Sequence, residues 1–299
     1  MTVETIIEKL KWLETNIQPF DQVEQYWIDT FDERRNSLIQ QKDKNESVYS
    51  KFECLKNENA VTLIHLDFKK ILPSASDEHI EEYWPYLCRF IREYSKIDEQ
   101  LYSNAVAQNL ISLLAEEPDD NNGVLILLLL AHMLKSTSIK PAAPKKSGKK
   151  RKNLSGDTPP QKKNDKSEQL KEPDFVNDFL AIVKIDSQIN ERVEEKKRVA
   201  AQQKKTVQPY MLFVGGPEKC TSFYVIVDDY KYKVDNPLNA LKLNFELFFF
   251  GNYEFPESCY NIWIFIQKFL FKTSTVGNKY PVKIKKMTGF IKYNMKIKL

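Results

Sequence analysis

The stretch from Pro141 to Lys166 constrains what this chain can fold into more than any other feature of the sequence. It reads PAAPKKSGKKRKNLSGDTPPQKKNDK and contains almost no apolar residue. Such a segment cannot bury enough surface to offset the entropy lost on ordering, so we expect it to be disordered. The chain is therefore predicted to have two folded halves, joined by a disordered lysine-rich linker over residues 141–170.

The composition supplies enough apolar material for folded domains on both sides of this linker. Of the 299 residues, 42% are hydrophobic, including 18 Phe, 14 Tyr and 4 Trp, which suffices for real cores. The 8 glycines are too few to favour large β-sandwiches or glycine-rich nucleotide-binding loops. Two domains of ordinary size fit a chain of this length.

Residues 1–140 show the three- and four-residue apolar spacing of amphipathic helices and are predicted to form an acidic helical domain. Pro19 separates the first two helices, and the charged run from Asp32 to Arg35 is interpreted as a solvated helix surface. Pro85 leaves open a later start for the helix that contains it. Val124 to Met133 is apolar all round and should be the buried central helix. The helices after Pro19 are expected at Asp21–Gln41, Thr62–Leu72, Asp77–Tyr94, Leu101–Ala115 and Val124–Met133.

Residues 171–207 are predicted to form a helical arm. Asp174 is a suitable N-cap for it. Beyond Glu194 the sequence becomes highly charged, so the helix should continue as an exposed arm to about Lys205. The apolar stripe that supports this helix consists of Phe175, Phe179, Ile182, Ile189 and Val193.

Residues 208–273 are predicted to form a small α+β module, because the apolar period changes to two after Pro209. Asp228-Asp229 supplies a turn, Asn236-Pro237 has the pattern of a helix start, and the last strong helix follows Phe255-Pro256. The strands are expected at 210–214, 223–227 and 230–234. The predicted fold class is thus mostly α, with an N-terminal helical bundle, a disordered basic linker and a small C-terminal α+β module of order βββαα.

Charge is distributed unevenly along the chain. Residues 1–140 carry 15 basic and 24 acidic side chains, a net charge of −9, whereas residues 141–166 carry 9 and 2, a net charge of +7. Residues 272–299 carry 8 lysines and no acid. The last nine residues alternate between apolar and polar, which fits a strand with one lysine face or a frayed tail. We therefore assign 274–299 as a basic tail.

The densest basic cluster lies inside the predicted linker. Import adaptors bind basic segments in an extended form, with acidic pockets for successive lysines. We therefore predict a nuclear import signal, an import adaptor as a partner, and a location in the nucleus. The alternative is a solvated charged linker that binds nothing. The candidate import residues are Lys145, Lys146, Lys149, Lys150, Arg151, Lys152, Lys162 and Lys163.

Lysines in the linker and the tail are also candidates for contact with nucleic acid. Lysine neutralises phosphate without regard to base sequence, whereas the predicted folded regions 1–140 and 210–271 are net acidic and should repel phosphate. We therefore predict weak, non-specific binding of nucleic acid. The candidate contacts in the tail are Lys283, Lys285, Lys286, Lys292, Lys296 and Lys298.

Aromatic residues in the last two predicted helices are expected first of all to form a core. A helix that is apolar on more than one face can also be a dimer surface. A homodimer, or contact with an unidentified protein partner, is therefore a second interpretation. The candidate interaction residues are Phe248, Phe249, Trp263 and Phe269.

No catalytic or metal-ligating pattern stands out, so the chain is predicted to be no enzyme and to need no cofactor or metal. His65, His79 and His132 are isolated in the sequence, and His132 is interpreted as a satisfied core histidine. The 4 cysteines are far apart and are interpreted as buried free thiols. Residues 223–229 resemble a Walker B strand, but no phosphate-binding loop accompanies them. The most apolar run, 124–130, is too short for a membrane span.

Four segments carry a resemblance to a known family: QPYMLFVGG, FYVIVDDYKYKV, NALKLNFELFFFGNYEFPES and NIWIFIQKFLF. Through them residues 208–273, and more weakly residues 67–133, resemble an uncharacterised family of insect proteins, with distant fish relatives, that is associated with mobile elements. The shared motifs are non-catalytic. Some relatives carry an N-terminal zinc finger whose ligands are missing here, so the resemblance does not imply sequence-specific DNA binding.

These features predict a nuclear, non-enzymatic protein derived from a mobile element. Its helical front and aromatic module would assemble with protein partners or with a second copy. Its linker and tail would contact DNA, RNA or chromatin non-specifically. Two alternatives stay open: a protein–protein adaptor with no nucleic-acid role, and a degenerate transposase relative without activity.

Overall fold

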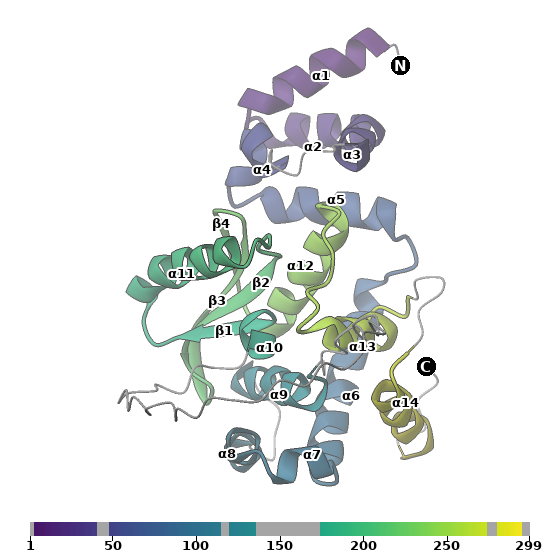
Figure 1. Ribbon diagram of the computed structural model, residues 1–299. Coiled ribbons are helices and arrows are strands. Elements are labelled where there is room, and N and C mark those ends of the chain that lie inside the picture. Colours follow the sequence, from purple (N-terminus) through teal and green to yellow (C-terminus); the bar gives the residue numbers. More distant parts are fainter. Residues whose placement is uncertain (1–2, 41–47, 115–119, 136–173, 274–279, 295–299) are drawn as a thin grey trace, which may run out of the picture.

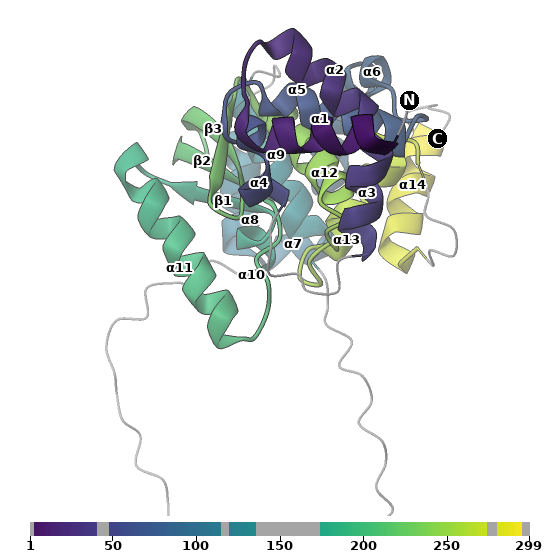
Figure 2. The same ribbon diagram turned by 90° about the horizontal axis from the view of Figure 1, so that it is seen from above.

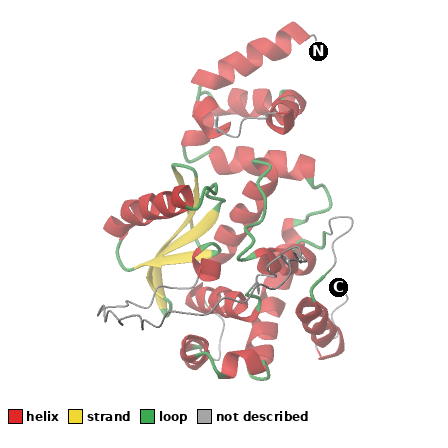
Figure 3. Cartoon of the chain, viewed as in Figure 1, coloured by secondary structure: helices red, strands yellow, loops and turns green. Residues whose placement is uncertain are grey.

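A computed structural model describes residues 3–40, 48–114, 120–135, 174–273 and 280–294. The predicted linker, with all eight candidate import residues, lies outside the described residues. Helices dominate the described part, and the strands gather at one side of the molecule (Figure 3). The predicted fold class, mostly α with a small C-terminal sheet, is confirmed.

The first half of the chain contributes helices alone within the part that is described (Figure 1). The predicted helix over 21–41 is in fact two helices, α2 and α3, which are separated at Thr30. Pro85 lies inside α6, which begins after the cap residue Ser76. The elements are α1 (Val3–Thr15), α2 (Phe20–Asp29), α3 (Phe31–Gln40), α4 (Val48–Lys51), the 3-10 turn η1 (Glu53–Lys56), α5 (Ala60–Ile71), α6 (Asp77–Ser95), α7 (Glu99–Tyr102), α8 (Ala105–Leu113) and α9 (Asp120–Met133).

The second half contains the sheet and five helices among its described residues. The side chain of Asn236 caps α12 by accepting a hydrogen bond from the backbone N–H of Asn239 at 2.8 Å, which confirms the predicted helix start. The elements are α10 (Asp174–Asn177), β1 (Leu180–Val183), the 3-10 turn η2 (Asp186–Gln188), α11 (Ile189–Gln202), β2 (Tyr210–Gly216), β3 (Lys219–Val227), β4 (Tyr230–Val234), α12 (Pro237–Phe250), α13 (Tyr260–Phe269) and α14 (Val282–Asn294).

The sheet has four strands in the order β1-β2-β3-β4 rather than the three that we predicted. β1 pairs with β2 in parallel, and β2–β3 and β3–β4 are antiparallel. The assignment of residues 180–183 to the helical arm is wrong. Leu180 to Val183 is a continuous apolar run, as expected of a parallel strand that is covered on both faces. Because this run does not alternate between apolar and polar residues, it lacks the period of two that indicates a strand. The helical spacing of the apolar residues on either side of it then leads to the wrong prediction of a helix.

Two helices cover the opposite faces of the sheet. Ile189 and Val193 of α11 pack with Leu212 and Val214 of β2 in a small separate cluster. α12 packs on the other face, against β2 and β3. Figures 1 and 2 show α11 lying apart from the bundle that α12 joins. Helix α11, which we expected to be an exposed arm, therefore covers one face of the sheet. Its buried apolar side chains lie in its first half, before its charged C-terminal half.

The predicted central helix is confirmed. Every residue from Val124 to Leu134 is buried, and α9 packs against α6, α8 and α12. Its position explains why its sequence is apolar on all sides, since helices from both halves of the chain surround it.

The two predicted halves share one hydrophobic core. α12 packs closely on α5, where Phe68 meets Phe245 and Phe249. Tyr232 of β4 donates a hydrogen bond to the Leu55 carbonyl at 2.7 Å. One continuous cluster of buried residues runs from Leu13 to Ile291. The described parts of residues 1–140 and 208–273 therefore pack against each other and share this core.

This shared core predicts that the chain holds together when it is cut in two. A specific protease site inserted between Gly156 and Asp157 should yield two fragments that co-elute in size exclusion under native conditions, because separation would expose the α5–α12 contact. The fragments should separate in denaturant. Separate elution in native buffer would contradict the shared core.

Candidate functional site

Helix α14 overturns part of the predicted basic tail. Ile284, Met287 and Ile291 are buried on one side of it, and Phe290 packs on the rings of Phe90 and Tyr94 from α6. The strand pattern expected from residue 291 onward is wrong for 291–294, and 295–299 lie outside the described residues. The helical spacing becomes visible only when Ile291 is taken together with Ile284 and Met287 upstream.

The outward side of α14 is basic. Lys285, Lys286 and Lys292 are exposed, and Tyr293 is 80% exposed. Gly289 lies between them, and a Cβ there would meet open space. The helix contains no acid. We call Lys285, Lys286, Lys292 and Tyr293 the lysine face of α14. Figures 1 and 2 both place this helix at the outside of the molecule, away from the sheet.

Three other candidate contacts have different outcomes. Lys283 is ion-paired with Asp98 at 2.7 Å and hydrogen-bonded to Gln100, so it anchors α14 to α7 instead of facing a ligand. Lys296 and Lys298 lie outside the described residues. The Lys283 pair leaves no trace in the local sequence, because its partner lies far upstream.

The predicted aromatic interaction surface is wrong. Phe248, Trp263 and Phe269 are at most 2% exposed, and Phe249 is half-buried. These side chains form the core, which is the first interpretation given above. α12 and α13 are apolar on several faces because other elements cover them on several sides: α12 contacts α5, α9, β2 and β3.

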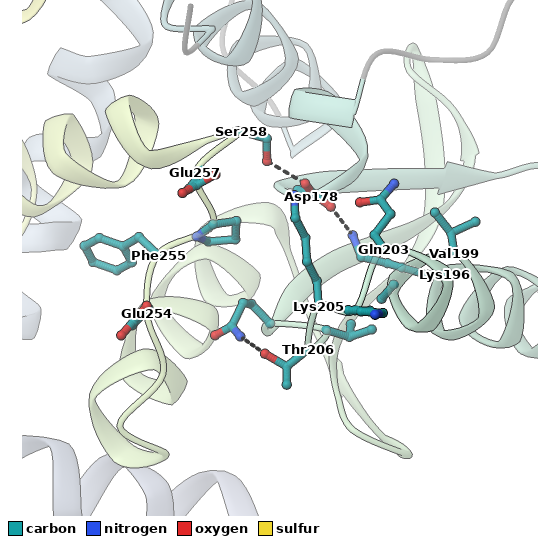
Figure 4. A pocket seen from close by; sticks show the side chains of 15 residues that line it. Asp178, Lys196, Val199, Gln203, Lys205, Thr206, Glu254, Phe255, Glu257 and Ser258 are labelled. Atoms are coloured by element: carbon teal, nitrogen blue, oxygen red, sulfur yellow. Dashed lines mark hydrogen bonds and ion pairs between the residues drawn. The ribbon is translucent and has the colours of Figure 1, made fainter. Parts of the chain in front are cut away.

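A pocket of about 490 Å³ lies where α11 and the segment after it meet the 254–258 loop (Figure 4). Lys196 of α11 donates to the Asn177 carbonyl at 2.6 Å and to Asp178 at 3.1 Å. Ser258 donates to the other oxygen of Asp178. The Lys196 ammonium also lies 4.0 Å from the centre of the Tyr210 ring. Burial lowers the pKa of Lys196, and Asp178 partly counters this effect.

The polar residues of this pocket hold neighbouring elements together and are not arranged for catalysis. The Lys196 ammonium is held by two acceptors and an aromatic ring, so it is well placed as a cation and poorly placed as a free nucleophile. The rim of the pocket carries charged side chains of both signs, so it does not favour a ligand of either charge. The chain of Lys196, Asp178 and Ser258 joins α11, the start of β1 and the approach to α13. The rim charges are Lys204, Lys205, Glu254 and Glu257.

A second polar cluster joins α5, α6 and α12. His65 Nδ1 lies 2.9 Å from Glu246 Oε1, and His65 Nε2 lies 3.2 Å from Asp77 Oδ2. Lys69 and Lys242 lie 2.9 and 3.3 Å from the Asp77 carboxylate. His65 looks isolated in the sequence, because its partners lie 12 and 181 positions away along the chain.

This cluster is the candidate metal site in the described part of the chain, since its ligand atoms lie within 4.8 Å of one another. A metal ion needs ligands that converge on one point. The two nitrogens of His65 instead face different carboxylates. Lys69 and Lys242 would also repel a cation at Asp77. The geometry therefore fits a protonated imidazole better than a metal ion.

The other residues that the sequence singles out are structural. His132 is 4% exposed, and its Nδ1 lies 3.0 Å from Asn104 Nδ2, which confirms a satisfied core histidine. Asp228-Asp229 forms the turn between β3 and β4, with Asp228 at a φ of 50°. The free cysteines are buried, except for the half-buried Cys220. Burial raises the pKa of the Cys54 and Cys88 thiols to about 12, which makes them poor nucleophiles.

No family model, curated protein or solved structure matches this chain. The resemblance to the mobile-element-associated family therefore stays a prediction. Among the helices that the structure describes, none combines the length and apolar character that a membrane crossing requires.

Proposed function

We propose that this is a nuclear, non-enzymatic protein of mobile-element origin that contacts DNA or RNA without sequence preference, while assembling with protein partners or a second copy. The observation that carries the proposal is the lysine face of α14. Three exposed lysines and an exposed tyrosine share one side of a helix that has no acid.

Physical chemistry supports phosphate as the ligand of this face. Each lysine that neutralises a phosphate releases condensed counterions, which favours binding at low salt. Lys285 and Lys292 are seven residues apart, so about 10 Å of helix axis separates them, a span that reaches more than one phosphate. Tyr293 can add stacking on an unpaired base. The predicted linker would supply further phosphate contacts and the import signal.

The anchoring of α14 distinguishes this face from a free charged tail. Three buried side chains and the Lys283–Asp98 ion pair fix the helix on α6 and α7. Fixed lysines lose less conformational entropy on binding than lysines in a mobile chain. The face should therefore bind more strongly than its charge alone suggests.

The test is the combined replacement Lys285→Gln, Lys286→Gln and Lys292→Gln in the full chain. We expect weaker binding to unrelated duplexes and single strands at low salt. The slope of log affinity against log salt should become shallower by up to about 3, roughly one for each phosphate that the variant no longer neutralises. Binding is measured by fluorescence anisotropy at several salt concentrations.

The matched control removes three exposed lysines at the sheet: Lys184→Gln, Lys219→Gln and Lys233→Gln. It loses the same charge and should bind almost as tightly as the wild type. Equal losses in both variants would show that net charge alone acts. Absence of binding by the wild type at low salt would favour the adaptor alternative.

A further inference from the structure

The contact between α12 and the α5–α6 pair contains a buried carboxylate that depends on a histidine. The side chain of Glu246 is 4% exposed, and that of His65 is 35% exposed. Within the described residues, the Glu246 carboxylate has His65 as its hydrogen-bond partner. A buried carboxylate without a partner is costly, so the state of His65 matters to this contact.

We propose that His65 is a pH-responsive latch, which ties α12 to α5 and α6 when protonated and loosens this joint when it loses its proton. Both ring nitrogens face carboxylates, at 2.9 and 3.2 Å. Only the imidazolium donates from both nitrogens. The neutral ring has a single N–H, so one carboxylate would then face a lone pair.

The charges around His65 come from all three helices. Lys69 lies one turn away on α5, Asp77 belongs to α6, and Glu246 and Lys242 belong to α12. Lys242 also pairs with Glu81 of α6 at 3.5 Å. Asp77 therefore keeps two lysine partners when His65 is neutral. Glu246 loses its charged hydrogen-bond donor, which makes it the group most affected by the change.

The sign of the pH effect follows from these contacts. The hydrogen bond and charge of Glu246 raise the pKa of His65, against a smaller effect of burial. The stability that His65 contributes is fully present below its ordinary pKa of about 6.5, and it is lost as pH rises through the raised folded value. Burial also raises the pKa of Glu246, which makes stability fall as pH rises above the ordinary glutamate value.

The other two histidines act in the opposite direction. Burial lowers the pKa of His79 and of His132. Their contributions are lost as pH falls below the ordinary histidine value, because the folded protein then resists their protonation. A loss of stability as pH rises above the ordinary histidine value therefore distinguishes His65 from them.

The latch can be measured without any substitution by following the three imidazole resonances in NMR from pH 5 to 9. His65 should titrate above the ordinary value, and Glu246→Gln should move its pKa back down. A His65 pKa at or below the ordinary value would overturn the proposal. Assignment is checked with His79→Gln and His132→Gln, each of which removes one of the other resonances.

Unfolding by urea supplies the second measurement. For each unit by which the His65 pKa is raised, the wild-type unfolding constant should increase about tenfold between the acidic and alkaline sides of the titration. His65→Gln should lack this rise, whereas His132→Gln should retain it. Amide exchange in α12 and α5 should speed up over the same range beyond its intrinsic pH dependence. An identical pH profile for wild type and His65→Gln would overturn the latch.

Discussion

Replacing Asp67 with alanine should destabilise the protein by about 3–5 kcal/mol, because it leaves the guanidinium of Arg34 buried without its counter-ion. Arg34 Nη1 lies 2.5 Å from Asp67 Oδ2, and Nη2 lies 2.9 Å from Oδ1. The two side chains are 4% and 6% exposed. The pair is thus bidentate and closed to solvent.

The surroundings of Arg34 prevent the guanidinium from turning toward water. Its Cζ lies 3.4 Å from the centre of the Trp27 ring. Its Nη2 also donates to the Trp27 carbonyl at 2.7 Å, and Nε donates to Thr30 Oγ1 at 3.2 Å. The cation is therefore held in place when the carboxylate is removed, and the full penalty should appear.

Urea unfolding of Asp67→Ala measures the effect. The double variant Arg34→Met, Asp67→Leu should recover most of the loss, since removing both charges relieves the desolvation cost. Glu93→Ala breaks an exposed pair with Lys96, whose side chains are 51% and 63% exposed, and should stay within about 0.5 kcal/mol. If the double variant is as unstable as Asp67→Ala, the loss of stability comes from altered packing and not from the unpaired charge.

Arg34 also shows where a charged run misleads. The interpretation of residues 32–35 as a solvated surface is wrong for Arg34, which is the buried residue of α3. Arg35 is drawn inward as well and donates to the Phe249 carbonyl at 2.7 Å. Charge runs usually are solvated, and the exceptions depend on partners that lie 33 and 214 positions away.

The features that are predicted correctly have local causes. The Asn236 cap, the turn at Asp228-Asp229 and the all-round apolar α9 each follow from a few neighbouring residues. β1 depends instead on pairing with β2, which lies 31 positions away in register. The His65 cluster likewise exists only because α5, α6 and α12 pack together. Non-local contacts of this kind leave no pattern in a single sequence.

The shared core has the same origin. A lysine-rich linker predicts folded halves on either side of it, and each half does contain its own apolar material. The sequence does not reveal that the aromatic residues of α12 and α13 are covered by helices from the first half. Phe265 of α13 meets Phe90 of α6, and Phe271 meets Phe68 of α5. A helix that is apolar on more than one face therefore indicates that something covers each of those faces. In this protein the covering elements belong to the same chain.

Replacing Trp263 with alanine tests this conclusion, and it should destabilise the protein by about 3–5 kcal/mol. Trp263 is fully buried, and its ring packs on Phe248 at 4.9 Å and Phe179 at 5.2 Å between centroids. Tyr293→Ala is the control, because an exposed aromatic residue should change stability by less than about 0.5 kcal/mol. Urea unfolding and sedimentation are measured together. If Trp263 belonged to a dimer surface, Trp263→Ala would change the sedimenting mass while leaving monomer stability intact; burial in the core requires the reverse.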